Sequence, residues 1–340
     1  MLNPSDRDRV SDYCRLFKTK YVVSYLVVFI LFLTVPRMMN PYLLHVLIYI
    51  FLYAFLGISW NIIGGYAGQL SLGHSIFFGI GAYTSTLCFI HFGLTPWIGM
   101  VIGALLSTVM GFFIGYLCFR YQLKGPYFAL ATLAFAEVIR VVVDNMDVIG
   151  GAQGLLIPNT ESTFYHFQFF DKLPFYYTIY FLTVTAFVIS YLIEKTKLGS
   201  FLMAIREDEV AAQSLGINST RYKIIAICIS AFLTSLGGTF YAQYVTFINA
   251  ETVFGLSGAI EIILRPIIGG MGSFLGPVIG SFVLGPLSEL TRVFLGEVSG
   301  VHLITYGIIL IFIILFMPEG LLQFFTNCCR KLLRRKGGDS

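Results

Sequence analysis

The chain has 340 residues and a formal net charge of +4, with 57% apolar and only 12% charged residues. Soluble globular chains carry about 25% charged residues, so the composition excludes a water-soluble protein, and the small positive charge does not indicate a nucleic-acid partner. Apolar runs recur along the whole sequence, and each is long enough to cross the roughly 30 Å hydrocarbon core of a bilayer as a helix. The sequence therefore predicts an all-α, polytopic transmembrane helical bundle surrounded by membrane lipid.

About ten helical segments are expected, with prolines at or near several of their ends. A missing backbone N–H costs least at a helix end, so Pro41, Pro96 and Pro126 mark boundaries. The expected segments are 21–35, 41–63, 74–92, 96–119, 126–145, 174–194, 223–244, 256–268, 277–295 and 301–317. The chain then divides into an N-terminal segment 1–20, a membrane domain 21–322 that includes the loop 195–223, and a basic tail 323–340.

Basic residues are concentrated in four segments outside these spans, at 1–20, 120–125, 195–223 and 318–340. The loops on the other side contain only Arg37 and Lys172. Lys and Arg accumulate on the cytoplasmic side of membrane proteins. The pattern predicts that the N-terminus, the loop 195–223 and the C-terminus are all cytoplasmic.

A glycine-rich stretch, residues 64–74, lies between the second and third expected spans. Its eleven residues include four glycines and three polar side chains. Glycine permits helix breaks, and broken helices build substrate sites in transporters because their freed backbone groups face protein or a water-filled path. The alternative is a tight connection whose small residues pack two helices. The candidate translocation residues here are Asn61, Gly64, Gly65, Gly68, Gln69, Ser71, Gly73 and His74.

A second glycine-rich stretch, residues 269–277, lies between the eighth and ninth expected spans. Like the first stretch, it has a Gly-Gly start, a nearby third glycine, a serine and a closing glycine. This weak internal symmetry is expected of a transporter built from a repeat. The sequence leaves open whether the two copies are parallel or inverted. The candidate translocation residues of this stretch are Gly269, Gly270, Gly272, Ser273 and Gly276.

The loop 197–217 reads as one short helix, which Gly216 ends in a left-handed conformation. Its spacing Glu209-x-Ala211-Ala212-x-x-x-Gly216 resembles the coupling-loop signature of ABC importer permeases. Small residues let such a helix seat in a groove, so we expect Glu209, Ala211 and Ala212 to be buried against a partner. The alternative is a surface amphipathic helix. The candidate ATPase-coupling residues are Arg206, Glu209, Ala211, Ala212 and Gly216.

Ionisable residues within the expected spans occur as acid–base sets at helical spacing. Residues three or four apart share a helix face, so each set can partly neutralise itself in lipid. We favour structural pairing over a substrate role for them. The sets are Glu137 with Arg140, Glu261 with Arg265, and Glu289 with Arg292. The sequence has no phosphate-binding loop and no metal or catalytic motif, so we expect no cofactor, no metal and no enzymatic activity of its own.

The stretch 61–83, the loop 204–216 and the stretch 269–280 together resemble the branched-chain amino-acid ABC permease family, LivM type. The stretches 125–133, 150–155 and 317–321 are similar to the same family, and all six occur in the expected order. The resemblance implies a multi-pass permease subunit of the cell inner membrane. It also implies a homologous second permease, two cytoplasmic ATPases and a periplasmic solute-binding protein as partners.

The resemblance implies branched-chain, hydrophobic amino acids as the substrate. Permeases for urea or short-chain amides look similar, so they stay as an alternative. An ion-coupled secondary transporter or channel built from the same broken helices is the rival from another class, and it would not need the coupling loop.

Overall fold

The computed structural model describes residues 32–158, 163–295, 307–308, 311, 315 and 320–323. The N-terminal segment 1–20 lies outside the described residues. The expected first and tenth spans and the basic tail 323–340 lie almost entirely outside them.

Most of the described chain is α-helical. The long helices are α2 (Pro41–Asn61), α3 (His74–Phe92), α4 (Pro96–Arg120), α5 (Pro126–Asp144), α6 (Lys172–Lys195), α9 (Ser219–Val245), α11 (Leu256–Gly269) and α12 (Gly276–Leu295). The short ones are α7 (Lys197–Glu207), α8 (Glu209–Ser214), α10 (Ala250–Phe254), the 3-10 turns η1 (Val35–Met38), η3 (Asp147–Ile149) and η4 (Gly151–Gln153), and the π-helical turn η2 (Ile62–Tyr66). Two short antiparallel strands, β1 (Leu155–Leu156) and β2 (Phe247–Ile248), pair Leu155 with Ile248.

Seven of the described helical stretches are long and apolar enough to cross a membrane, which confirms an all-α, multi-pass membrane bundle. They coincide with the seven spans expected between residues 41 and 268, and α12 coincides with the ninth. Pro41, Pro96 and Pro126 are each the first residue of a helix, where proline needs no hydrogen-bond partner.

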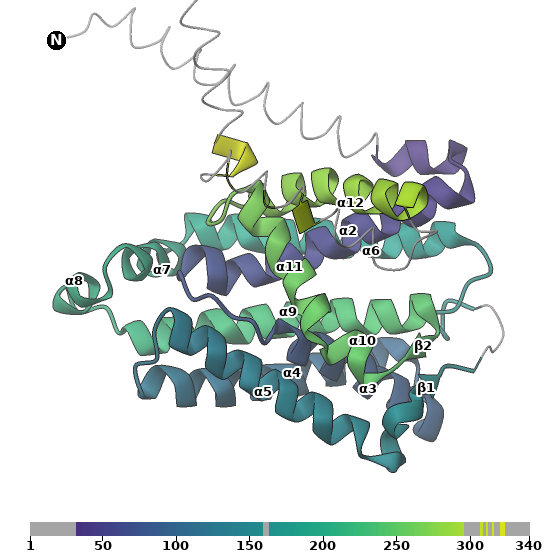
Figure 1. The fold of residues 1–340 in the computed structure, drawn as a ribbon, viewed down its shortest axis with the longest axis horizontal. Helices are drawn as coiled ribbons and strands as arrows, with labels where there is room; N and C mark the ends of the chain where they lie inside the picture. Colours follow the sequence, from purple (N-terminus) through teal and green to yellow (C-terminus); the bar gives the residue numbers. More distant parts are fainter. Residues whose placement is uncertain are drawn as a thin grey trace, which may run out of the picture.

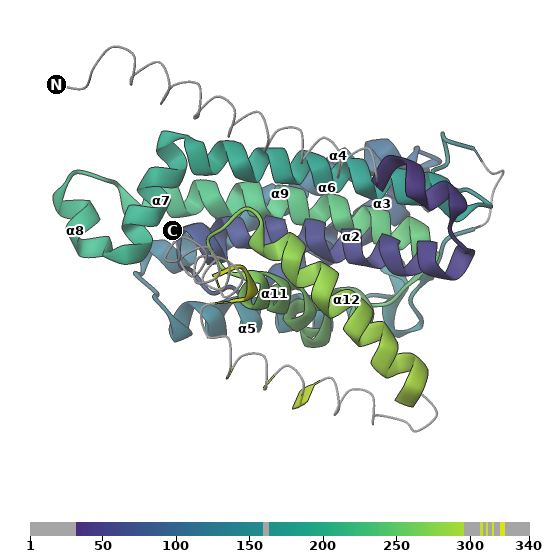
Figure 2. The same ribbon diagram turned by 90° about the horizontal axis from the view of Figure 1, so that it is seen from above.

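The central helix of the bundle is α2, which packs against α6, α9, α11 and α12. Figure 2 shows α6, α9 and α2 side by side, with α12 on the far side of α2 from α9. A second group is formed by α9 with α3 and α4. The helices approach closely at glycines: a Cβ on Gly238 would overlap the carbonyl oxygen of Phe78, and one on Gly81 would overlap that of Ser235. Small residues at such contacts are typical of helix packing in membranes.

The two ends of the bundle differ in their connections. In Figure 1, α7 and α8 project from one end, whereas β1 and β2 lie at the other. Lys124, from the loop between α4 and α5, lies 3.0 Å from Glu209 of α8. The basic loops 120–125 and 195–223 therefore share one end, as the expected topology requires.

The loop 197–217 contains two helices rather than the single short helix expected. Asp208 separates α7 from α8 in an extended conformation, and its carboxylate accepts hydrogen bonds from the backbone N–H groups of Val210 and Ala211. Aspartate is a preferred N-cap residue because it satisfies these otherwise unpaired N–H groups. The stop at Gly216 is confirmed: its φ is +85°, and its N–H bonds to Gln213.

Candidate functional site

The first glycine stretch is a broken helix. The end of α2 widens into the π-helical turn η2, and the chain then runs without regular structure to His74, where α3 begins (Figure 1). Trp60 closes the break from inside, because its Nε1 donates a hydrogen bond of 2.8 Å to the carbonyl of Ser71. Its ring also fills the space that a Cβ on Gly64 would need. π-Helical turns of this kind often occur at functional sites.

Asn61 joins this break to the second glycine stretch. Its Nδ2 donates to the carbonyl of Ser273 at 2.9 Å, and its Oδ1 accepts from the N–H of Gly272 at 3.0 Å. Asn61 is fully buried. A Cβ on Gly65 would overlap Asn61 Oδ1 and lie 2.7 Å from the Gly272 nitrogen. We call this contact between the two breaks, formed by Asn61, Gly65, Gly272 and Ser273, the glycine junction.

The second break is a compact turn between α11 and α12. Gly270 and Gly272 adopt φ of +122° and +78°, a region that residues with a Cβ rarely enter. A Cβ on Gly269 would overlap the carbonyl of Gly276, and one on Gly276 would overlap that of Gly270. Backbone therefore meets backbone at this turn, and Ser273 adds one bond, from the N–H of Leu275 to its hydroxyl.

Arg206, near the end of α7, reaches the glycine junction. Its Nη1 donates a hydrogen bond of 2.9 Å to the carbonyl of Gly65. A Cβ on Gly68 would lie 2.9 Å from Arg206 Cγ, and one on Gly272 would overlap Nη1. The sequence grouped Arg206 with the coupling loop alone. Arg206 and Gly65 are 141 residues apart in the sequence, so no local sequence pattern predicts their contact.

His74 lies in the interior, next to the first break. Its Nδ1 lies 3.0 Å from Ser71 Oγ and its Nε2 lies 2.7 Å from Ser230 Oγ, so the ring links the break to α9. Ser230 in turn donates to the carbonyl of Ser59 in α2. These bonds hold α2, α3 and α9 together around the break.

The other predicted residues of this break also contact protein. Gln69 Nε2 donates to the carbonyl of Ala67 at 3.2 Å. Gly73 packs against α5, where a Cβ would lie 2.5 Å from the carbonyl of Thr132. Leu72, which precedes Gly73, donates its N–H to Thr132 Oγ1.

Glu209 begins α8 and makes two ion pairs within the chain. Lys223 Nζ lies 2.7 Å from one carboxylate oxygen, and Lys124 Nζ lies 3.0 Å from the other. Burial of the carboxyl group raises its pKa, but the hydrogen bonds from Lys223 and Lys124 and the charge of Lys223 outweigh this and hold the pKa below its ordinary value. Glu209 thus ties α8 to α9 and to the loop between α4 and α5.

The outer surface at α8 includes exposed apolar side chains beside the polar Gln213 and Ser214. Val210 is 66% exposed and Leu215 is 82% exposed, and Ala211 is exposed beside them. Ala212, by contrast, is buried within its own chain. The expectation that Glu209 and Ala212 need a partner to bury them is therefore wrong, because both already contact this chain. The exposed apolar residues at α8 are Val210, Ala211 and Leu215, of which the sequence singled out only Ala211.

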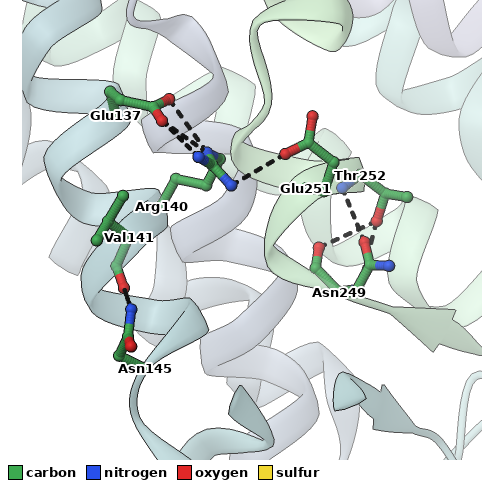
Figure 3. A network of polar contacts seen from close by, with 7 residues as sticks. All are labelled: Glu137, Arg140, Val141, Asn145, Asn249, Glu251 and Thr252. Carbon is green, nitrogen blue, oxygen red and sulfur yellow. Dashed lines mark hydrogen bonds and ion pairs between the residues drawn. The ribbon is translucent and has the colours of Figure 1, made fainter. Parts of the chain in front are cut away.

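Two of the expected acid–base sets are paired in the structure. Arg140 pairs with Glu137 on α5 and also bonds to Glu251 of α10 at 3.0 Å, as Figure 3 shows. Arg265 lies 3.6 Å from Glu261. For the third set, Glu289 accepts a hydrogen bond from the Tyr42 hydroxyl, while the side chain of Arg292 lies outside the described residues.

The family whose model matches this chain is described as the branched-chain amino acid transport system permease component, and the match covers residues 42–315. The chain belongs to this permease family. The high-affinity branched-chain amino acid transport permease LivM of Salmonella typhimurium is 31% identical over 313 residues, which cover 85% of this chain and 71% of that protein. LivM of Escherichia coli K12 is also 31% identical, over 84% of this chain and 70% of its own length.

LivH of Salmonella typhimurium is more distant, at 21% identity over 79% of this chain and 91% of its own length. This permease is therefore similar to permeases named LivM and, more distantly, to one named LivH. It is a multi-pass transport component rather than an enzyme, and it works as part of a multi-component ABC transporter.

Proposed function

We propose that this permease is the membrane-spanning subunit of an ABC importer that moves branched-chain amino acids across the cell inner membrane. The family match over residues 42–315 carries the proposal. A periplasmic binding protein would deliver the amino acid, a second, homologous permease would complete the membrane part, and two cytoplasmic ATPases would supply the energy. The LivM names of two relatives that align with more than four fifths of this chain support the substrate.

The contacts at the α7 end suggest how ATP hydrolysis reaches the membrane helices. An ATPase would seat against Val210, Ala211 and Leu215, whose exposed apolar side chains have no lipid to face at a cytoplasmic loop. Asp208 caps α8 and so separates α8 from α7, while the two helices stay adjacent. A push on α8 would then move α7 and with it Arg206, which bonds to Gly65.

The glycine junction would convert that push into a change between inward-facing and outward-facing states. Asn61 links the break after α2 to the break before α12, so a displacement of one break is passed to the other. Packed helices exchange between a few discrete arrangements, and a ligand or partner acts by favouring one of them. In this mechanism the predicted glycines act as the joint around which the helices on either side rock.

The decisive test is uptake by the complete importer reconstituted in proteoliposomes with its binding protein. We expect leucine uptake to require ATP on the side of the membrane where the ATPases lie. Urea should not compete with leucine. Uptake of urea or a short-chain amide in place of leucine would support the alternative substrate. Uptake that follows an ion gradient without ATP would instead support the secondary transporter.

The predicted orientation has its own test, in a cysteine-free background in intact cells. A cysteine in place of Ser214 should resist a membrane-impermeant thiol reagent, because α8 would be cytoplasmic. A cysteine in place of Leu156, 71% exposed at the opposite end, should be labelled. Labelling at Ser214 from outside would overturn the topology.

A further inference from the structure

The helix α11 carries a buried arginine whose hydrogen-bonding capacity is only partly used. Arg265 is 2% exposed, and only its Nη2 approaches a carboxylate, that of Glu261 at 3.6 Å. Among the described residues, its Nε and Nη1 have no hydrogen-bond partner. Buried guanidinium N–H groups are costly to leave unpaired, so this arginine has donors to offer a ligand.

A cavity lies between α2, α3, α9, α10 and α11, and the guanidinium of Arg265 packs on the ring of one of its lining residues. Tyr53 lines this cavity, and its ring centroid lies 4.4 Å from Arg265 Cζ. Gly258 and Ile262 line it from α11, and Arg265 lies on the same helix face, one turn beyond Ile262. Tyr241 of α9 lines the cavity as well.

The cavity itself is mostly apolar. Leu52, Leu56, Phe78, Val253 and Ile262 form much of its wall. It measures about 50 Å³, which is room for several water-sized groups and suits a short branched hydrocarbon rather than a whole amino acid. Ser75 adds one polar group to the wall, and in the described part of the chain its buried hydroxyl has no partner.

We propose that Glu261, Arg265 and this cavity form a binding site for a free amino acid with an aliphatic side chain, on the translocation path. The α-carboxylate would bind the free N–H groups of Arg265, the α-ammonium would bind Glu261, and the side chain would enter the cavity. The site rests on the proposed function, since it supplies the substrate contact that an amino-acid importer needs. It reverses the interpretation of this acid–base set as structural pairing alone.

The chemistry favours a zwitterion over a neutral solute. An amino acid must have both charges compensated to leave water, and an adjacent carboxylate and guanidinium offer one partner for each. When the site is empty, the two side chains compensate each other, which limits the cost of holding charges inside a membrane protein. Urea and short-chain amides carry no charge and would have to compete with the existing ion pair. The site therefore discriminates against the alternative substrates.

The experiment compares two matched pairs in the reconstituted importer, with leucine-loaded binding protein as the probe. E261Q/R265Q removes both charges of the site and keeps a polar side chain at each position, and E137Q/R140Q makes the same substitutions in the set on α5. We expect E261Q/R265Q to lower leucine uptake at least about tenfold while loaded binding protein still stimulates ATP hydrolysis to within about twofold of wild type. The control pair should leave uptake and hydrolysis within about twofold of wild type.

Ser75→Val guards against a misfolded double variant, because Ser75 lines the cavity and a larger apolar side chain there would occupy space that the substrate side chain needs. It should lower leucine uptake about threefold while the variant still folds and loaded binding protein still stimulates ATP hydrolysis. Wild-type uptake by E261Q/R265Q overturns the site, as does wild-type uptake by Ser75→Val if the double variant does not fold. A wild-type importer that consumes ATP without taking up leucine is a distinct result, and it refutes the proposed function instead.

Discussion

At the first glycine break the chain is held by side chains, whereas at the second it is held by glycine backbones in contact. Trp60 and His74 bond to Ser71 to fix the first break. At the second, a Cβ on Gly269 or Gly276 would overlap a backbone carbonyl. The first break should therefore respond to the loss of single polar groups, and the second to any added Cβ. Gly65, although it belongs to the first break, faces the second and is as crowded as the glycines there.

The largest effect is expected where a bulky side chain enters either break. Gly65→Leu would collide with Asn61 and the Gly272 nitrogen, and Gly270→Leu would force a side chain onto a backbone with φ of +122°. Both variants should reach the membrane in normal amounts and lose leucine uptake in proteoliposomes. Gly307→Ala is a control, since a Cβ there would meet nothing within 4 Å among the described residues. Normal uptake by both leucine variants would mean that the breaks merely pack helices.

The next largest effect is expected at Asn61, because its side chain connects the two breaks. Asn61→Ala leaves the Gly272 N–H and the Ser273 carbonyl without their partner, at a cost of roughly 1–3 kcal/mol for a buried group. We expect about a tenfold loss of uptake and a lower unfolding temperature in detergent. Gln69→Ala, which removes only a bond to its neighbour Ala67, should change both much less. Equal effects of the two substitutions would contradict a special role for the junction.

A smaller effect is expected at Arg206, which reaches both breaks from α7. Arg206→Ala should weaken the link between the coupling helices and the junction. Stimulation of ATP hydrolysis by loaded binding protein should fall about fivefold, equivalent to roughly 1 kcal/mol, the net contribution of one partly exposed hydrogen bond, with basal hydrolysis unchanged. Arg221→Ala, an exposed arginine at the start of α9, serves as the control. Full stimulation in Arg206→Ala would show that coupling bypasses the junction.

The smallest effect concerns the stability of α8 as pH changes. The pKa of Glu209 is lowered in the folded chain, so its ion pairs stabilise the fold above the ordinary glutamate pKa of about 4.5, and this contribution is lost as pH falls through the lowered value. Thermal unfolding of the solubilised permease should therefore show Glu209→Gln as less stable than wild type at pH 7. The difference should shrink below about pH 4.5. A difference that is constant across this range would exclude the charge of Glu209 as its cause.

Glu137–Arg140 and Glu261–Arg265 show the limit of a local pattern. Both pairs have a glutamate followed three or four residues later by an arginine, so both share one helix face within a predicted span. Arg140 is partly exposed and pairs with both Glu137 and Glu251, while Arg265 is buried and its Nε and Nη1 have no hydrogen-bond partner among the described residues. The neighbours that make this difference come from other helices, so the sequence interpretation treated both pairs alike.

The sequence contains a signal for the break between α7 and α8, although the sequence-based prediction joined them into one helix. Asp208 is followed by Glu209 and by a run of small residues, and aspartate before such a run is a helix N-cap signal. The chain around it is rich in helix formers, which favoured one continuous helix instead. The side chain of Asp208 settles the competition by bonding to two N–H groups of α8.

The sequence by itself determined the membrane bundle, the bounds of its apolar helices to within a few residues, the places that need glycine and the stop at Gly216. These features depend on hydropathy, proline geometry and φ, which act within a few residues of chain. Only the tertiary structure decided that Asn61 meets Gly272, that Arg206 meets Gly65 and that Tyr53 lies beneath Arg265. Such contacts join residues far apart in the sequence, and they arise from how the helices pack, which no local pattern encodes.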